Sequence, residues 1–180
     1  MKPLAFLLQL TFIIWLDSSV LAQTKPAATQ IPDEVMKAEF GSVTDSAPIR
    51  LGADKDGVLV VALWASWCGP CRLVIAALNG SKKDFESRGV KVVGLTTEDP
   101  AKDSKEVHAF LTESKVDFSV AWLDAEHAKV LMGGRDAIPQ ILVLAGDGTV
   151  AKRFVGWNRE HTMSQLREAV EEALTKAAPE

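Results

Sequence analysis

The sequence predicts an α/β domain in which a mixed central sheet is flanked by helices on both faces. Residues 58–64 form a continuous apolar run after Asp56-Gly57, which is typical of a central strand buried on both faces. Downstream, short β-branched runs alternate with segments whose apolar residues have helical spacing. Near the C-terminal end, Gly146-Asp147-Gly148 separates two strand patterns and predicts an antiparallel hairpin. A sheet that combines this hairpin with strand-helix alternation is mixed.

The elements follow one another along the chain. Residues 35–51 contain short apolar pieces separated by small residues and proline, which favours short strands or a hairpin. A helix over residues 72–88 should end near Gly89, with Asn79-Gly80 as a candidate interruption. The remaining patterns predict strands over 90–95, 118–120, 141–144 and 149–155, and helices over 101–114, 125–131 and 160–176. The order is therefore βαβα followed by βαββα.

Length and composition restrict the classes of protein to consider. The 180 residues suffice for one domain of ordinary size, and 47% hydrophobic with 24% charged residues is typical of a globular protein. The net charge is -4, with 20 basic and 24 acidic residues and no long run of either sign. A nucleic-acid partner is therefore not expected. The sequence also carries no strong signal for an oligomer.

The N-terminus predicts export. Lys2 precedes an apolar run over residues 4–16, and Val20 and Ala22 form a small-residue cleavage pattern before Gln23. We therefore expect a signal peptide over 1–22. An uncleaved membrane anchor is the alternative, although the run is shorter than the roughly 20 residues that cross a bilayer. Residues 23–34 lack apolar periodicity and are expected to be a flexible segment before a domain over 35–180. The compartment should be extracytoplasmic and permit disulfides.

The only two cysteines lie in Trp67-Cys68-Gly69-Pro70-Cys71, where the buried strand ends and a helix begins. Free N–H groups and the positive end of the helix dipole should stabilise a thiolate at Cys68 and lower its pKa. Cys71 lies one helical turn further, within reach of Cys68 but more enclosed. Pro70 suits the first turn, where its missing N–H would have had no intrahelical partner. We expect Cys68 to be the nucleophile and Cys71 the resolving thiol.

Two other interpretations of the cysteines stay open. A disulfide could be an inert staple, although so short a loop removes little entropy from the unfolded chain. Two thiolates and a histidine could also hold a soft metal, but none of the three histidines, at positions 108, 127 and 161, adjoins the cysteines. A non-catalytic metal-handling or structural module is thus the alternative to an enzyme. For the enzyme we expect no metal and no cofactor beyond the redox-active Cys68–Cys71 disulfide.

The run from Leu63 to Arg72, the strand and helix over 90–114, and Ala137-Ile138-Pro139 before the hairpin carry a resemblance to a known family. Over most of the mature chain, the sequence resembles the secreted TlpA/ResA-like group of thiol-disulfide oxidoreductases. The resemblance implies a thioredoxin-like fold. It also implies that Pro139 follows a cis peptide bond and faces the disulfide. The backbone next to Pro139 is then expected to pair with an incoming substrate strand. A trans proline that starts an edge strand is the alternative. The residues expected to bind the substrate are Trp67, Gly69, Pro70, Ile138 and Pro139.

The sequence departs from the family at three positions. Ala62 stands where thioredoxins have a buried aspartate, Val74 where the ResA-like group has a glutamate, and Ala76 where relatives have a helix-kinking proline. Glu98 is a candidate acid only because the fold should place it nearby, and we expect it to be a solvated loop residue. Deprotonation of Cys71 should then rely on water or another group.

The expected function is thiol-disulfide exchange on proteins outside the cytoplasm. The Cys68 thiolate attacks a substrate disulfide, and Cys71 resolves the mixed disulfide. Gly69-Pro70 is the dipeptide of thioredoxin, which implies a reducing role. Relatives with this secretory layout reduce apocytochrome c, as in cytochrome c maturation, or other periplasmic cysteine proteins. The implied partners are a protein substrate with cysteines and a membrane electron donor that recycles the dithiol.

Overall fold

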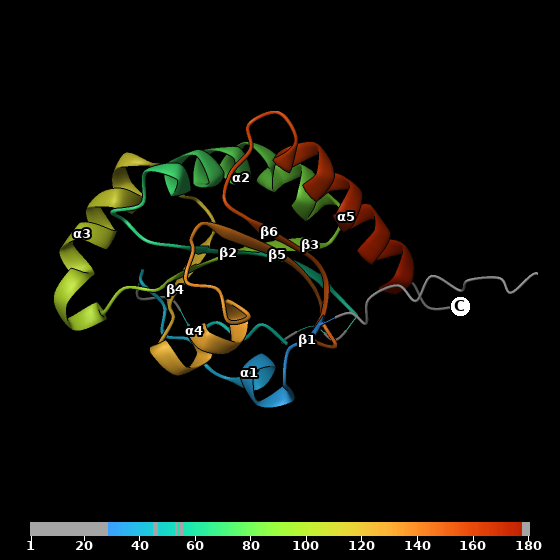
Figure 1. Cartoon of the computed structure of the whole chain (residues 1–180), viewed down its shortest axis with the longest axis horizontal. Helices are drawn as coiled ribbons and strands as arrows, with labels where there is room; N and C mark the ends of the chain where they lie inside the picture. Colours follow the sequence, from blue (N-terminus) through green and yellow to red (C-terminus); the bar gives the residue numbers. More distant parts are fainter. Residues whose placement is uncertain (1–28, 45–46, 53, 55, 178–180) are drawn as a thin grey trace, which may run out of the picture.

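A six-stranded mixed sheet forms the centre of the computed structural model, which describes residues 29–44, 47–52, 54 and 56–177 (Figure 1). The strands are β1 (Thr29–Gln30), β2 (Val58–Trp64), β3 (Val90–Thr96), β4 (Ser119–Trp122), β5 (Gln140–Ala145) and β6 (Thr149–Val155), in the order β1-β6-β5-β2-β3-β4. Pairing is parallel from β2 through β3 to β4, and antiparallel from β2 through β5 and β6 to β1. The expected mixed sheet and terminal hairpin are confirmed.

Helices cover both faces of the sheet, as expected. They are α1 (Asp33–Lys37), α2 (Gly69–Ser87), α3 (Pro100–Glu113), α4 (Ala125–Leu131) and α5 (Thr162–Ala177). Alternate residues of β2 face opposite sides, so Val60 and Ala62 pack in the core with α2, α3 and α5, while Val61 and Leu63 pack with α1 and α4 (Figure 1). All seven residues of β2 are buried. In the described part of the chain, no helix is long and apolar enough to cross a membrane.

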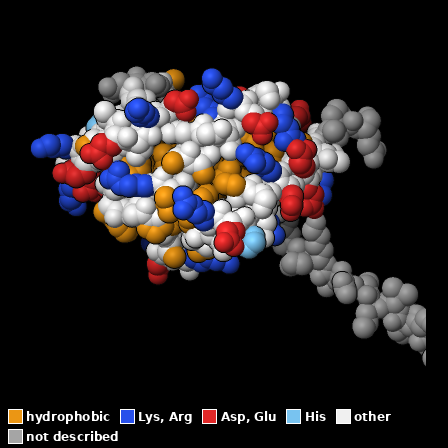
Figure 2. Space-filling model, turned by 90° about the horizontal axis from the view of Figure 1, so that it is seen from above, with side chains coloured by type: hydrophobic (Ala, Val, Ile, Leu, Met, Phe, Trp, Pro, Cys, Tyr) orange, Lys and Arg blue, Asp and Glu red, His pale blue; other side chains and the backbone are white. Residues whose placement is uncertain are grey.

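The face that bears α2 and α5 carries both signs of charge. Figure 2 shows Lys and Arg side chains interspersed with Asp and Glu over this face, with apolar side chains exposed between them. No single sign of charge gathers there, which agrees with the lack of charge runs in the sequence.

The helix after the cysteines continues without interruption to Ser87. Asn79, which was expected to weaken it, donates from Nδ2 to the carbonyl oxygens of Ser114 and Lys115, at 3.0 and 3.1 Å. Its side chain therefore connects the middle of α2 to the end of α3. Gly89 follows the C-cap Arg88 with a φ of 76°, which allows the chain to turn into β3.

The N-terminal part of the domain differs from the expectation. The boundary at Val35 is too late, because β1 pairs with β6 and Ile31 is only 1% exposed. The Ile31 N–H donates to the Gly148 carbonyl oxygen at 2.8 Å, which connects this segment to the β5–β6 turn. Residues 29–34 thus belong to the fold, whereas the expected signal segment over 1–22 lies outside the described residues.

Residues 33–37 form a short helix instead of a strand. Acidic Asp33 and Glu34 occupy its first turn and Lys37 its last, an arrangement that suits the helix dipole. Among the described residues of this segment, the expected hairpin is represented by an isolated antiparallel bridge between Phe40 and Ile49.

Two glycines provide a matched test of this packing. Gly80 lies inside α2, and an added Cβ would meet no atom within 4 Å, so Gly80→Ala should stabilise the fold by about 0.5–1 kcal/mol. At Gly94 the same Cβ would lie 3.1 Å from Trp64 Nε1 and 3.2 Å from a Phe118 ring carbon, so Gly94→Ala should destabilise the fold by about 1–3 kcal/mol. Urea unfolding of the two variants measures both effects. A destabilised Gly80→Ala would contradict the uninterrupted helix.

Candidate active site

The cysteine pair lies where β2 ends and α2 begins. The Cys68 N–H donates to the Ala65 carbonyl oxygen at 3.1 Å, which closes a turn over residues 65–68. Cys68 is the N-cap of α2, and its Sγ accepts a hydrogen bond from the Cys71 N–H at 3.3 Å. Pro70 lies in the first turn, as expected. The helix N-terminus is thus directed at the sulfur of Cys68, where it can stabilise a negative charge.

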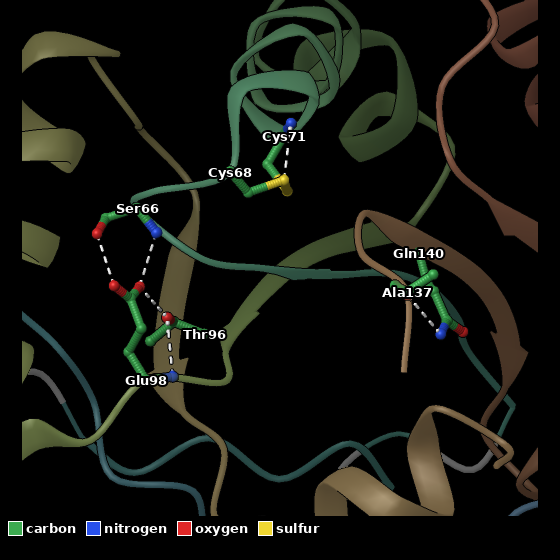
Figure 3. Close-up of a disulfide and its surroundings, with 7 residues drawn as sticks. All are labelled: Ser66, Cys68, Cys71, Thr96, Glu98, Ala137 and Gln140. Atoms are coloured by element: carbon green, nitrogen blue, oxygen red, sulfur yellow. Dashed lines mark hydrogen bonds between the residues drawn. A yellow bond between two sulfur atoms is a disulfide. The ribbon is translucent and has the colours of Figure 1, made fainter. Parts of the chain in front are cut away.

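Cys68 and Cys71 form a disulfide, with their Cα atoms 5.3 Å apart (Figure 3). The two residues differ in their surroundings, because Cys71 is fully buried whereas Cys68 is 4% exposed beside Trp67, which is 74% exposed. Gly69 and Pro70 are exposed as well. A partner protein can therefore approach the pair from the Cys68 side.

The peptide bond between Ile138 and Pro139 is cis. Gln140, the next residue, pairs with Leu63 of β2, so the loop that contains the proline lies at the same edge of the sheet as the cysteines (Figure 3). The Pro139 carbonyl oxygen accepts from the Gly156 N–H at 2.8 Å. In the described part of the chain, the N–H and C=O of Ile138 have no hydrogen-bond partner. These two groups can pair with the backbone of an extended peptide.

A buried polar network supports the proline loop. Gln140 is fully buried, its Nε2 donates to the Ala137 carbonyl oxygen at 2.9 Å, and its Oε1 accepts from Arg153 Nη1 at 2.7 Å. Arg153 Nη1 also donates to the Leu131 carbonyl oxygen. Burial, followed by the nearby charge of Arg135, lowers the pKa of Arg153. Sequence reasoning missed this network, although a glutamine that opens an otherwise apolar strand was a visible signal.

The cation next to the cysteine motif is engaged elsewhere. The Arg72 guanidinium lies over the Phe110 ring, 4.7 Å from its centroid, and pairs with Glu113 at 3.2 Å. Phe110 also stacks against Trp64, which is fully buried in the same core cluster as both cysteines. Arg72 therefore stabilises the packing between α2 and α3.

The expectation that Glu98 is a solvated loop residue is wrong. Glu98 is only 8% exposed, and its carboxyl group accepts from Ser66 N at 2.7 Å, from Ser66 Oγ at 2.6 Å and from Thr96 Oγ1 at 2.8 Å (Figure 3). The cause is the sheet register, in which Trp64 pairs with Thr96. Ser66 and Glu98 each follow their paired residue by two positions, so they meet at one edge. Parallel pairing of β2 with β3 could have predicted this contact between Ser66 and Glu98.

The described histidines do not approach the cysteines. His108 contacts Ser104 in α3, His127 contacts Asp124 at the start of α4, and His161 lies beside Glu160. In the described part of the chain, no group of three or more His, Cys, Asp or Glu residues is placed to hold a metal ion.

Comparisons with known proteins identify the family of this chain. The Redoxin family model matches residues 26–170. The chain is 26% identical over 161 residues to thiol:disulfide interchange protein HelX of Rhodobacter capsulatus, covering 86% of this chain and 88% of HelX. It is also 26% identical over 157 residues to the thiol:disulfide interchange protein DsbE homolog of Paracoccus denitrificans, covering 87% of this chain and 74% of that protein.

Solved structures give the same fold. A thioredoxin family thiol:disulfide interchange protein from Chlorobium tepidum superposes with a TM-score of 0.65 at 22% identity, covering 85% of this chain and 99% of that one. StoA from Bacillus subtilis superposes with a TM-score of 0.60 at 20% identity, covering 75% and 98%. The fold is thioredoxin-like, as the sequence predicted.

Alkylation of the reduced protein tests the difference between the two thiols. Cys68 lies at the helix N-terminus and Cys71 is fully buried, so iodoacetamide near neutral pH should modify Cys68 about tenfold faster or more. Peptide mass spectrometry of samples quenched over time gives both rates, with the single-cysteine variants Cys68→Ala and Cys71→Ala as controls. Equal rates would contradict the assigned roles.

Proposed function

The chain belongs to the Redoxin family and is a thiol-disulfide oxidoreductase, and from that premise we propose that it reduces disulfide bonds in partner proteins through Cys68 and Cys71. The observation that carries this proposal is the disulfide itself, which joins the N-cap Cys68, 4% exposed beside the exposed Trp67, to the fully buried Cys71 one turn further. This arrangement suits a nucleophile and a resolving thiol.

The reaction transfers two electrons from the reduced cysteine pair. The Cys68 thiolate attacks one sulfur of the substrate disulfide, that S–S bond breaks, and the departing thiolate takes a proton from water. Cys71 then loses its proton and attacks Cys68 Sγ, which breaks the mixed disulfide. The products are a substrate dithiol and the oxidised Cys68–Cys71 pair. An external reductant must return this pair to the dithiol state.

We propose that the exposed residues Trp67, Gly69 and Pro70 contact the partner protein around Cys68. The backbone N–H and C=O of Ile138, which have no hydrogen-bond partner among the described residues, support pairing with an extended substrate segment. The exposed Trp67 beside Cys68 supports a protein substrate with an accessible disulfide.

The direction of electron flow is proposed on electrostatic grounds. Strong stabilisation of a Cys68 thiolate would favour the reduced form and make the pair oxidising. The closest cation in the sequence, Arg72, is engaged by Phe110 and Glu113, which leaves the helix N-terminus as the stabilising group. Modest stabilisation and the thioredoxin dipeptide Gly69-Pro70 both support a reductant.

We further propose that the protein acts outside the cytoplasm, as its N-terminal sequence suggests, in the manner of the TlpA/ResA-like group. Its partners would be periplasmic proteins with cysteines, such as apocytochrome c, together with a membrane electron donor. The alternative is a non-catalytic module, and absence of turnover with any disulfide substrate would favour it.

Trapping of the mixed disulfide tests the proposed chemistry. Without the resolving thiol, Cys71→Ala should accumulate covalent complexes with disulfide-containing proteins, because the bond to Cys68 cannot be released by the pair. Non-reducing gels and mass spectrometry identify the attached protein. The matched variant Cys68→Ala should form few complexes, and equal trapping by both variants would contradict the proposed order of attack.

Redox equilibration tests the proposed direction. The Cys68–Cys71 pair should have a potential near that of thioredoxin, about -270 mV, and far below about -120 mV for the oxidant DsbA. Equilibration in dithiothreitol buffers of graded potential, read by alkylation, gives the value. A potential close to that of DsbA would overturn the reductant assignment and leave the oxidoreductase assignment intact.

A further inference from the structure

Glu98 has the geometry of a structural clamp. Its carboxyl group is buried and accepts three hydrogen bonds, two from Ser66 and one from Thr96. In the described part of the chain, no lysine, arginine or histidine pairs with it. A buried carboxyl group is costly unless such hydrogen bonds satisfy it. The clamp therefore depends on these three donors.

The clamp holds the turn that presents the nucleophile. Ser66 is the second residue of the turn that begins at Ala65 and ends at Cys68. Glu98 engages both the N–H and the hydroxyl of Ser66, so the second residue of the turn has little freedom to move. The Thr97 N–H also donates to the Trp64 carbonyl oxygen at 3.0 Å, and this hydrogen bond joins the end of β2 to the residue that follows β3.

The same turn contains Trp67, which is 74% exposed and lies directly before Cys68. Movement of Ser66 would displace both the side chain that faces a partner and the sulfur that attacks the substrate disulfide. Figure 3 shows Glu98 reaching across from the end of β3 to Ser66, next to the segment that leads into the disulfide.

We propose that Glu98 is a positioning residue for thiol-disulfide exchange, acting through Ser66 to hold the 65–68 turn so that Cys68 Sγ stays at the N-terminus of α2. This inference rests on the proposed function. It assigns Glu98 no contact with the reacting sulfurs, and it differs from a proton-accepting role for Cys71.

Hydrogen bonding and charge can be separated at this position. In Glu98→Gln, the amide oxygen can accept from Ser66 N–H and Thr96 Oγ1, while the amide nitrogen can donate to Ser66 Oγ, since a hydroxyl both donates and accepts. Gln therefore preserves the clamp without the charge. Glu98→Asp keeps the charge but withdraws the carboxyl group from Ser66, and Glu98→Ala removes both.

The experiment compares Glu98→Ala, Glu98→Asp and Glu98→Gln, with Glu106→Ala as the control that removes an exposed carboxylate from α3. Two rates are measured well below the thermal unfolding midpoint of each variant. One is iodoacetamide alkylation of Cys68 in the reduced protein, which needs no substrate. The other is reduction of insulin disulfides.

In Glu98→Ala and Glu98→Asp, we expect iodoacetamide to modify Cys68 at least about threefold more slowly near pH 7. The reason is that a displaced Cys68 sulfur loses stabilisation by the helix N-terminus. Their insulin kcat/KM should fall about tenfold. Glu98→Gln and Glu106→Ala should stay within about twofold of the natural chain on both rates. Ser66→Ala, which loses one of the two donors, should lie between these groups.

If Glu98→Ala and Glu98→Asp matched the natural chain in both Cys68 alkylation and insulin reduction, the proposal would be overturned. A loss in Glu98→Gln as large as in Glu98→Ala would overturn it too, because the carboxyl group would then act through its charge or as a proton acceptor. If Glu98→Ala does not fold, Glu98→Asp and Ser66→Ala give the same comparison. Failure of the natural chain to reduce insulin would reject the proposed function, while the alkylation rates would still test the clamp.

Discussion

The pairing of β2 with its two neighbours determines where every part of the site lies. Parallel pairing with β3 sets Trp64 opposite Thr96, so the segments after both strands leave the sheet at one edge. Antiparallel pairing with β5 sets Leu63 opposite Gln140, which brings the cis-proline loop to the same edge. Three segments distant in sequence therefore converge on the cysteine pair. A shift of register by one residue would reverse the faces of β2 and separate them.

Reactivity at this edge depends on an unequal environment for two chemically identical side chains. Cys68 caps α2 and is adjacent to solvent, whereas Cys71 lies within the core beside Val74 and Trp64. The helix N-terminus favours a negative charge on the first sulfur, and apolar packing disfavours it on the second. Because Arg72 is engaged by α3, no neighbouring side-chain cation in the motif adds to the first effect.

The parts of the fold with strong local signals could be predicted from sequence. The bounds of β2, β6 and α4 match their patterns, because apolar periodicity and turn residues act within each segment. The burial of Ile31 could not be predicted, since it depends on a distant turn at Gly148 and on no periodicity of its own. At the site, the cysteines and Pro139 carry recognisable motifs. Glu98 and Gln140 do not, because their roles arise only when separate strands pair.

Ala62 and Val74, the two positions at which the family resemblance implied an acid, are apolar and fully buried. Their apolar side chains cannot take a proton from Cys71. The buried carboxyl group that the described chain does place near the motif, that of Glu98, is occupied by hydrogen bonds to Ser66 and Thr96. In the role proposed for it, Glu98 holds the turn, and proton removal from Cys71 would then fall to water or another group. The resolving step should therefore depend more on pH and on the partner than the attacking step, which the helix N-terminus assists directly.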